Sequence, residues 1–344
     1  MSTSTSSAAA ASALLIIDVQ NDFLPPSGSL AVPDGGDVLP IISGLLKEEW
    51  MEDVWDIVVA SQDWHPHTHI SFSSHHKHPH ARPFTTVRVP RDVLGEHVDI
   101  HQDDENGSNS NQRDGNTEDE DDHEGEDNLG LTDPRSGYKT TQGVDDGQVD
   151  LNLWPDHCVK NTRGAEIERD LRTALKPWHR AGKFALVRKG TRSNVEAFSA
   201  FSGKVVPVGS PEMDSVLGMY MNGRTTTTTV TGTGSADEPE QEQEEEAGED
   251  LAGFLIKLGV KKICVVGLAT DFCRLHVRRY SVAQTALAAM NRESSPFTVY
   301  LYEPAVRGVG KASSDKALRV CADRGVKVLH TEQELREAFA GMAT

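Results

Sequence analysis

VVGLATDFC, residues 265–273, is the stretch that decides the fold: a β-branched apolar run, a turn of small residues and the start of a helix. A buried strand that leads through a tight turn into a helix is the building unit of a parallel sheet with crossover helices. The same alternation recurs along the chain. The expected strands span residues 13–17, 56–60, 184–187, 262–266, 297–301 and 326–329, and the expected helices span residues 37–50, 165–175, 250–258, 270–290, 313–324 and 332–339. We predict one α/β domain, a doubly wound parallel sheet with helices on both faces.

Two acidic segments interrupt this domain. Residues 101–130 hold 12 acidic side chains against one Arg, and residues 235–250 hold 9 acidic side chains and no base, which together account for the net charge of −19. Such segments cannot bury enough apolar surface to offset their chain entropy. We expect a disordered N-terminus over residues 1–12 and a single α/β domain over residues 13–340, with disordered low-complexity insertions at 101–148 and 222–249. A role for the insertions in binding a basic partner is the alternative.

The cysteines and the start of the chain indicate the compartment. Cys158, Cys264, Cys273 and Cys321 are scattered without a CxxC pair, which favours a reducing environment. Residues 1–12 lack the basic start of a secretion signal, and no run of about 20 apolar residues is present. Phosphates would repel the acidic segments. We expect a cytoplasmic protein, and leave open that it is also nuclear. We expect it to bind neither membrane nor nucleic acid, and we leave a homo-oligomer open.

Reactive side chains follow the expected strands. Ligands of open parallel sheets bind outside the carboxyl ends of the strands. Asp18 follows the first strand, Asp63 and His65 the second, Lys189 the third and Cys273 the fourth. We therefore expect these side chains to meet at one edge of the sheet.

Each of these residues has an ordinary interpretation beside the chemical one. Near the start of a helix, Cys273 would have a lowered pKa and act as a nucleophile, or it is a buried structural cysteine. Beside apolar walls, Asp18 would have a raised pKa and take the thiol proton, or it caps a turn. Lys189 would hold that carboxylate and stabilise developing charge, or it is a surface lysine.

One carboxylate and two imidazoles offer a metal site. Asp63 and His65 stand two residues apart at a strand end, and His157 lies in the distant segment WPDHC. This donor set, with open positions, suits a catalytic zinc, iron or manganese ion. Further histidines crowd the same region and are interpreted as a solvated loop: His75, His76, His78 and His80.

Four segments in this order carry a family resemblance. They are IIDVQNDF (residues 16–23), QDWHP with HISF (62–66 and 69–72), WPDHCV (154–159) and GLATDFC (267–273). With them, the chain resembles the nicotinamidase branch of the isochorismatase-like cysteine hydrolases. The resemblance covers nearly all of residues 13–330 except the two acidic insertions.

The resemblance implies roles for single residues. It implies a catalytic triad of Asp18, Lys189 and Cys273, and a divalent metal, zinc before iron or manganese, on Asp63, His65 and His157. Water completes the metal shell, with His69 as the alternative ligand. The resemblance also implies a cis peptide between Leu268 and Ala269 whose amides form an oxyanion hole with that of Cys273, and a pyridine ring held between Phe23 and Trp154.

The activity that follows from the resemblance is hydrolysis of nicotinamide to nicotinate and ammonia through a cysteine thioester, as in NAD salvage. Another amidase or hydrolase of this fold is the first alternative, because fold does not fix function. The Asp63, His65 and His157 set argues against a metal-free hydrolase. An inactive scaffold with acidic partner-binding loops is the second alternative, against which the complete triad argues.

Overall fold

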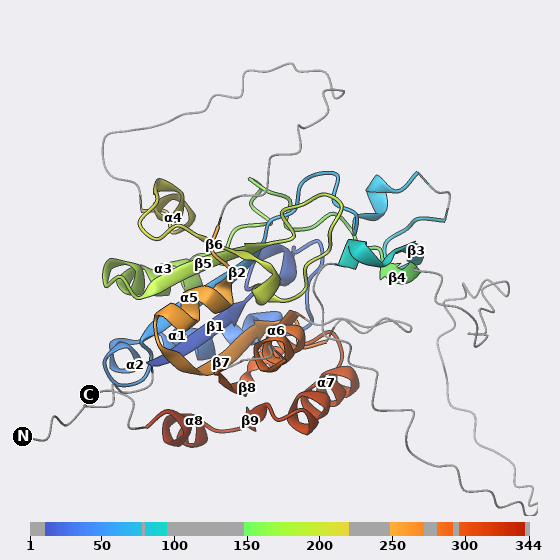
Figure 1. Cartoon of the computed structure of the whole chain (residues 1–344). Coiled ribbons are helices and arrows are strands. Elements are labelled where there is room, and N and C mark those ends of the chain that lie inside the picture. Colours follow the sequence, from blue (N-terminus) through green and yellow to red (C-terminus); the bar gives the residue numbers. More distant parts are fainter. Residues whose placement is uncertain are drawn as a thin grey trace, which may run out of the picture.

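The computed structural model describes residues 11–77, 80–94, 148–219, 248–271, 281–291 and 296–340. The strands of its main sheet are β1 (Ala11–Ile17), β2 (Ile57–Asp63), β5 (Phe184–Lys189), β6 (Lys204–Val206), β7 (Val260–Leu268), β8 (Thr298–Arg307) and β9 (Lys327–Leu329). Within the described residues they lie in the order β6-β5-β2-β1-β7-β8-β9 (Figure 1). Neighbouring strands run parallel except at one edge, where the unexpected strand β6 runs antiparallel to β5.

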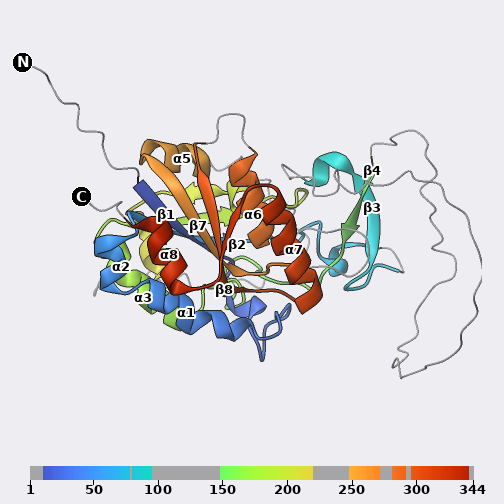
Figure 2. The ribbon, with the colours of Figure 1, turned by 90° about the horizontal axis from the view of Figure 1, so that it is seen from below.

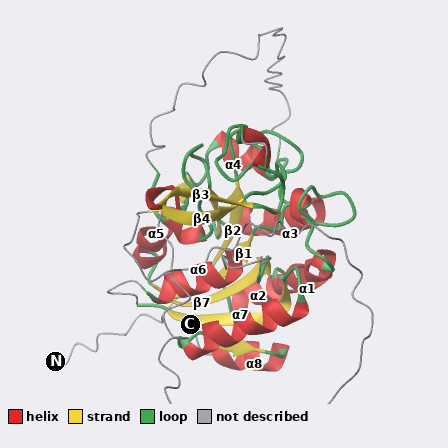
Figure 3. Ribbon diagram, turned by 90° about the vertical axis from the view of Figure 1, so that its right-hand side faces the viewer, coloured by secondary structure: helices red, strands yellow, loops and turns green. Residues whose placement is uncertain are grey.

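Helices cover both faces of this sheet, which confirms the expected fold class (Figure 1 and Figure 3). The α-helices are α1 (Val38–Leu45), α2 (Glu48–Asp53), α3 (Arg169–Arg180), α4 (Pro211–Val216), α5 (Leu251–Lys257), α6 (Ser281–Met290), α7 (Lys311–Asp323) and α8 (Glu332–Phe339). Short 3₁₀ turns are η1 (Asn21–Phe23), η2 (Gly35–Asp37), η3 (Ser73–His75), η4 (Arg91–Leu94) and η5 (Ala200–Ser202).

The central strand β1 is buried on both faces. Leu14 and Ile16 pack into one core with α1, α3 and α8, whereas Leu15 and Ile17 pack into the other with α5, α6 and α7. The alternation follows from the strand period of two residues, with helices rather than water on each side. This burial explains why the segment is a continuous apolar run.

Three expected helices differ from those observed. The single helix expected over residues 37–50 is two helices, because the chain becomes extended at Lys47. The helix expected over 165–175 begins at Arg169, where the Glu168 carboxylate accepts the backbone N–H groups of Asp170 and Leu171 as an N-cap. Thr270 does not begin a helix; α6 starts at Ser281, and residues 272–280 lie outside the described residues.

A separate hairpin lies beside the sheet. Strands β3 (Thr86–Pro90) and β4 (Gln148–Asn152) pair antiparallel and pack around their own small cluster of Val89, Leu151 and Leu153, away from the sheet in Figure 2. Most of both expected insertions and the expected N-terminal tail lie outside the described residues, although residue 148 already belongs to β4. None of the described helices is long and apolar enough to span a membrane.

Candidate active site

Three neighbouring strands bring Asp18, Asp63 and Lys189 to one edge of the sheet, beside the end of β7. Asp18 directly follows β1, Asp63 ends β2, Lys189 ends β5 and Leu268 ends β7. Asp63 and Lys189 are paired neighbours on β2 and β5. Because these strands are parallel, their carboxyl ends lie side by side, as the sequence predicted.

Asp18 is a buried carboxylate in an unusual backbone conformation. Its φ of 50° turns the chain away from the sheet directly after β1. Ser61 holds it twice: the Asp18 backbone N–H donates to Ser61 Oγ at 3.1 Å, and Ser61 Oγ donates to Asp18 Oδ1 at 2.6 Å. The other oxygen, Oδ2, lies 2.9 Å from Lys189 Nζ and has no further hydrogen-bond partner among the described residues.

Lys189 is a buried cation between two carboxylates. Its side chain is 1% exposed, and its Nζ pairs with Asp18 and donates a hydrogen bond to Asp63. A third contact, to the carbonyl oxygen of Ala197 at 3.2 Å, uses the remaining N–H. The surface-lysine interpretation is therefore wrong. Burial alone would lower the pKa of Lys189, but the two carboxylates raise it above its ordinary value.

The pKa values of Asp18 and Asp63 are shifted in opposite directions. Burial raises the pKa of Asp18 to about 6, against the opposing effects of Lys189 and Ser61. Burial also acts to raise the pKa of Asp63, but Lys189 and His65 hold it well below its usual range. Asp63 therefore stays ionised while Asp18 can exchange a proton near neutral pH.

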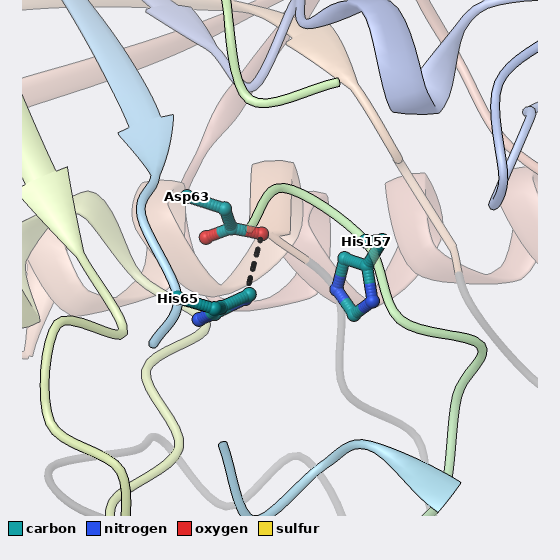
Figure 4. Close-up of side chains that lie close together, drawn as sticks. All are labelled: Asp63, His65 and His157. Carbon is teal, nitrogen blue, oxygen red and sulfur yellow. Dashed lines mark ion pairs between the residues drawn. The ribbon is translucent and has the colours of Figure 1, made fainter. Parts of the chain in front are cut away.

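Asp63, His65 and His157 converge, with ligand atoms within 4.8 Å of one another (Figure 4). Nδ1 of His65 donates to the carbonyl oxygen of Gly190 at 2.8 Å, and Nδ1 of His157 donates to that of Pro155 at 2.8 Å. A carbonyl oxygen can only accept, so Nδ1 of each ring carries a proton and Nε2 of the neutral ring presents its lone pair. His65 Nε2 lies 3.6 Å from Asp63 Oδ2.

Two more buried side chains border this cluster. His69 stacks on His65 with ring centroids 4.0 Å apart, and together with Glu196 the two histidines form a second group of potential ligands. His69 uses both ring nitrogens, Nδ1 with Ser71 Oγ at 2.7 Å and Nε2 with the carbonyl oxygen of Val195 at 3.2 Å. This favours water over His69 as the remaining metal ligand.

The expected substrate contacts lie around the same cluster. The Phe23 ring centroid is 5.7 Å from that of His157. Trp154 forms a backbone bridge with Phe72, whose ring in turn contacts those of His65 and His157. The peptide bond between Leu268 and Ala269 is cis, the geometry that the resemblance implied. Cys273 lies outside the described residues, so its position stays a prediction.

The three cysteines that the structure describes, together with His75 and His80, fit their ordinary interpretations. Cys158, Cys264 and Cys321 are buried free thiols, and burial raises the pKa of each. A buried neutral thiol is inert. In the histidine-rich loop, His75 and His80 are exposed, as expected, and His78 lies outside the described residues. His76 differs, because it is half-buried and its Nε2 donates to the carbonyl oxygen of Ile70 at 2.6 Å.

Several residues of the site had not been singled out from the sequence. Ser61 contacts Asp18, Gln20 contacts the backbone of Asp63, Gly190 contacts His65, and Glu196 lies beside His65 and His69. Ser61 stands two residues before Asp63 in β2, and Gln20 stands two residues after Asp18, just beyond the end of β1. That spacing, which places side chains on one side of a strand, was the available signal.

Known proteins resemble the chain in sequence and in structure, although no protein-family model matches it. The nicotinamidase of Acinetobacter baylyi is 26% identical over 263 residues, 76% of this chain and 70% of the relative. The nicotinamidase of Saccharomyces cerevisiae is 29% identical over 189 residues, 55% of this chain and 61% of the relative.

A solved structure of the yeast nicotinamidase superposes with a TM-score of 0.56 at 21% identity and covers 93% of this chain and 100% of the yeast chain. A second structure of the yeast protein, with the inhibitor nicotinaldehyde, has a TM-score of 0.55 at 20% identity and the same coverage. At these identities the superpositions show the fold, and the curated relatives add the sequence similarity. The chain is thus related to nicotinamidases in both sequence and fold, which confirms the resemblance that its four motifs carry.

Proposed function

We propose that the protein is a nicotinamidase that hydrolyses the carboxamide C–N bond of nicotinamide, with Cys273 as nucleophile and a divalent metal on Asp63, His65 and His157. The observation that carries the proposal is the buried Lys189 ammonium between Asp18 and Asp63, which joins a proton acceptor to a metal carboxylate. The relatives are hydrolases of this bond, and the yeast protein binds nicotinaldehyde, which shares the pyridine ring of the amide.

The chemistry of the donor set fits a divalent metal. Asp63 remains ionised beside Lys189, and the Nδ1 hydrogen bonds of His65 and His157 orient both rings with Nε2 available. Three protein ligands that leave open positions are typical of catalytic zinc sites. A metal held by these residues would supply a Lewis acid that polarises and orients the substrate.

The first half of the reaction forms a thioester. Asp18 takes the thiol proton of Cys273 on Oδ2, the oxygen whose one partner among the described residues is the Lys189 ammonium. The thiolate then attacks the amide carbon, and the backbone amides of Ala269 and Cys273 hold the oxyanion. The C–N bond breaks as the nitrogen takes the proton from Asp18 and leaves as ammonia.

The second half releases nicotinate. A water molecule gives a proton to Asp18 and attacks the thioester carbon. The sulfur leaves and recovers the proton from Asp18, which restores the thiol and the carboxylate. A pKa of about 6 suits this exchange, because Asp18 must accept and return a proton in each half-reaction near neutral pH.

The first experiment measures ammonia release from nicotinamide by the purified full-length protein. We expect Cys273→Ala to abolish turnover and to leave nicotinamide binding intact, because metal and pocket remain. Cys321→Ala is the matched control, since this buried thiol lies on α7, in the core that packs against α5 and α6. Chelator treatment should abolish turnover, and added zinc should restore it.

Each outcome bears on one part of the proposal. Turnover by Cys273→Ala would refute the nucleophile, and turnover that survives complete metal removal would refute the metal role. A wild-type protein that folds, binds zinc and still releases no ammonia from nicotinamide would refute the substrate.

A further inference from the structure

The main-chain pairing of the two central site strands ends before the site begins. The last β1–β2 pair is Ile16 with Ala60, after which Asp18 turns the chain out of the sheet. β2 continues for three more residues and pairs on its other side with β5, up to Asp63 opposite Lys189. On the side facing β1, the N–H and C=O groups of the buried Asp63 therefore lack a strand partner.

The side chain of Gln20 takes the place of that strand. Its Oε1 accepts the backbone N–H of Asp63 at 2.9 Å, and its Nε2 donates to the backbone carbonyl of Asp63 at 2.8 Å. A side-chain amide carries the donor and the acceptor of a peptide group, so it can replace one in a ladder. The second Nε2 hydrogen donates to the carbonyl of Ala165 at 2.8 Å, and Gln20 is fully buried.

We propose that Gln20 is a positioning residue for the metal site: its amide fixes the main chain of Asp63 and thereby the direction of the Asp63 carboxylate toward metal and Lys189. This inference rests on the proposed function, because it assumes that Asp63 is a metal ligand. Partners that orient a metal-binding residue contribute to metal affinity although they do not touch the metal.

The chain holds a matched control next to the residue under test. Gln62 is buried like Gln20 and donates from Nε2 to the same carbonyl, that of Ala165, at 2.6 Å. Its Oε1 accepts from Arg188 Nε at 3.2 Å. Among the bonds described, the side chain of Gln62 does not hold the backbone of Asp63. Gln62→Met thus removes a buried amide of the same kind without releasing the metal carboxylate.

The experiment measures zinc affinity by competition with a chromophoric chelator for wild type, Gln20→Met, Gln62→Met and His65→Ala. Methionine keeps the length of glutamine and removes both hydrogen-bonding groups. We expect Gln20→Met to weaken zinc binding about 10- to 100-fold, and Gln62→Met to stay within about threefold of wild type. Thermal unfolding of each variant identifies a temperature at which all are folded, where the competition is run.

The outcomes separate this inference from the proposed function. Equal zinc affinity of Gln20→Met and Gln62→Met, with loss of zinc only in His65→Ala, would overturn the role of Gln20 and leave the metal site standing. Failure of wild type itself to bind zinc would overturn the metal site and this role with it. If Gln20→Met does not fold, Gln20→Asn, whose amide is one methylene too short to reach both groups of Asp63, should show the weakened zinc binding.

Discussion

At the scale of single residues, the site rests on two carboxylates that share one ammonium. Lys189 pairs with both, yet Asp63 keeps a depressed pKa while burial raises the pKa of Asp18 to about 6. Lys189 and His65 lower the pKa of Asp63 against its burial, whereas burial is the largest effect on Asp18 and outweighs its partners Lys189 and Ser61. Similar side chains thus acquire different tasks, one as a permanent anion and one as a proton carrier.

The hydrogen bond from Ser61 to Asp18 gives a testable pH dependence. A donor to a carboxylate stabilises the ionised form and lowers the pKa, so Ser61→Ala should raise the pKa of Asp18 above its value of about 6. Because Asp18 must be ionised to accept the thiol proton, kcat/KM rises with pH through this pKa. We expect the rising limb to move to higher pH by about one unit.

The measurement is kcat/KM for ammonia release as a function of pH, from about 5 to about 9, a range that spans the rising limb. Ser12→Ala is the control, since Ser12 is a buried serine of β1 whose hydroxyl bonds Val54, away from the site. An unmoved limb in Ser61→Ala would show that Asp18 does not govern it.

At the scale of elements, the turn after β5 shapes the metal site. Gly190 follows Lys189 with a φ of +62°, and a Cβ at this position would overlap the His65 ring. The close approach lets the Gly190 carbonyl accept from His65 Nδ1. The strand that delivers the buried lysine therefore also orients a metal-binding histidine.

Alanine at Gly190 tests this turn. Gly182 has a similar φ of +69° but open space where a Cβ would lie, so Gly182→Ala carries the backbone strain alone. We expect Gly182→Ala to lose about 1–2 kcal/mol of stability and Gly190→Ala to lose more, because its Cβ also overlaps the His65 ring. Only Gly190→Ala should lose zinc affinity, by about tenfold or more. Thermal unfolding and zinc competition measure the two effects, and equal zinc affinity in both variants would contradict the turn's role.

The helices and strands also show how much of the fold could be predicted from the sequence alone. The apolar runs placed the strands of the parallel sheet, and with them Asp18, Asp63 and Lys189, because strand ends follow directly from local patterns. The start of α3 was placed too early because Ala165 and Ile167 are buried by contacts of a loop, not by a helix. The short β6 and the β3–β4 hairpin carried too few residues to stand out.

The hydrogen bonds that Gln20 and Ser61 form in the site could not be predicted, for a different reason. Gln20 bonds Asp63, and Ser61 bonds Asp18, across 43 residues of sequence in each case. The two-residue spacing could have singled out Gln20 and Ser61, but it does not name their hydrogen-bond partners, which are defined only once the sheet has formed. The family resemblance supplied the cis peptide and the aromatic pair, which local patterns did not indicate.

At the scale of the whole molecule, the acidic segment of residues 101–130 lies in the sequence between the two strands of the hairpin. β3 and β4 pair up to Pro90 and Gln148, so the two ends of the intervening chain are held together by the hairpin itself. The hairpin has its own small apolar cluster, separate from both cores of the sheet (Figure 2).

Deletion of residues 101–130 should therefore leave the fold and the chemistry in place. Shortening a loop to about half its length changes its closure entropy by only about 0.6 kcal/mol. We expect kcat/KM for nicotinamide within about twofold of wild type and a melting temperature within a few degrees. Collapse of thermal unfolding, with loss of ammonia release, would show that the acidic segment is structural.

The hydrogen bonds between Ser61 and Asp18, and between Gln20 and Asp63, have a consequence for folding. β1 is apolar on both faces, so sliding it by one residue would exchange leucine and isoleucine side chains between two similar cores at little hydrophobic cost. Only the native alignment gives Ser61 the carboxylate of Asp18 and gives Gln20 the peptide groups of Asp63. The polar bonds that orient the site therefore also distinguish the native sheet from its slipped competitors.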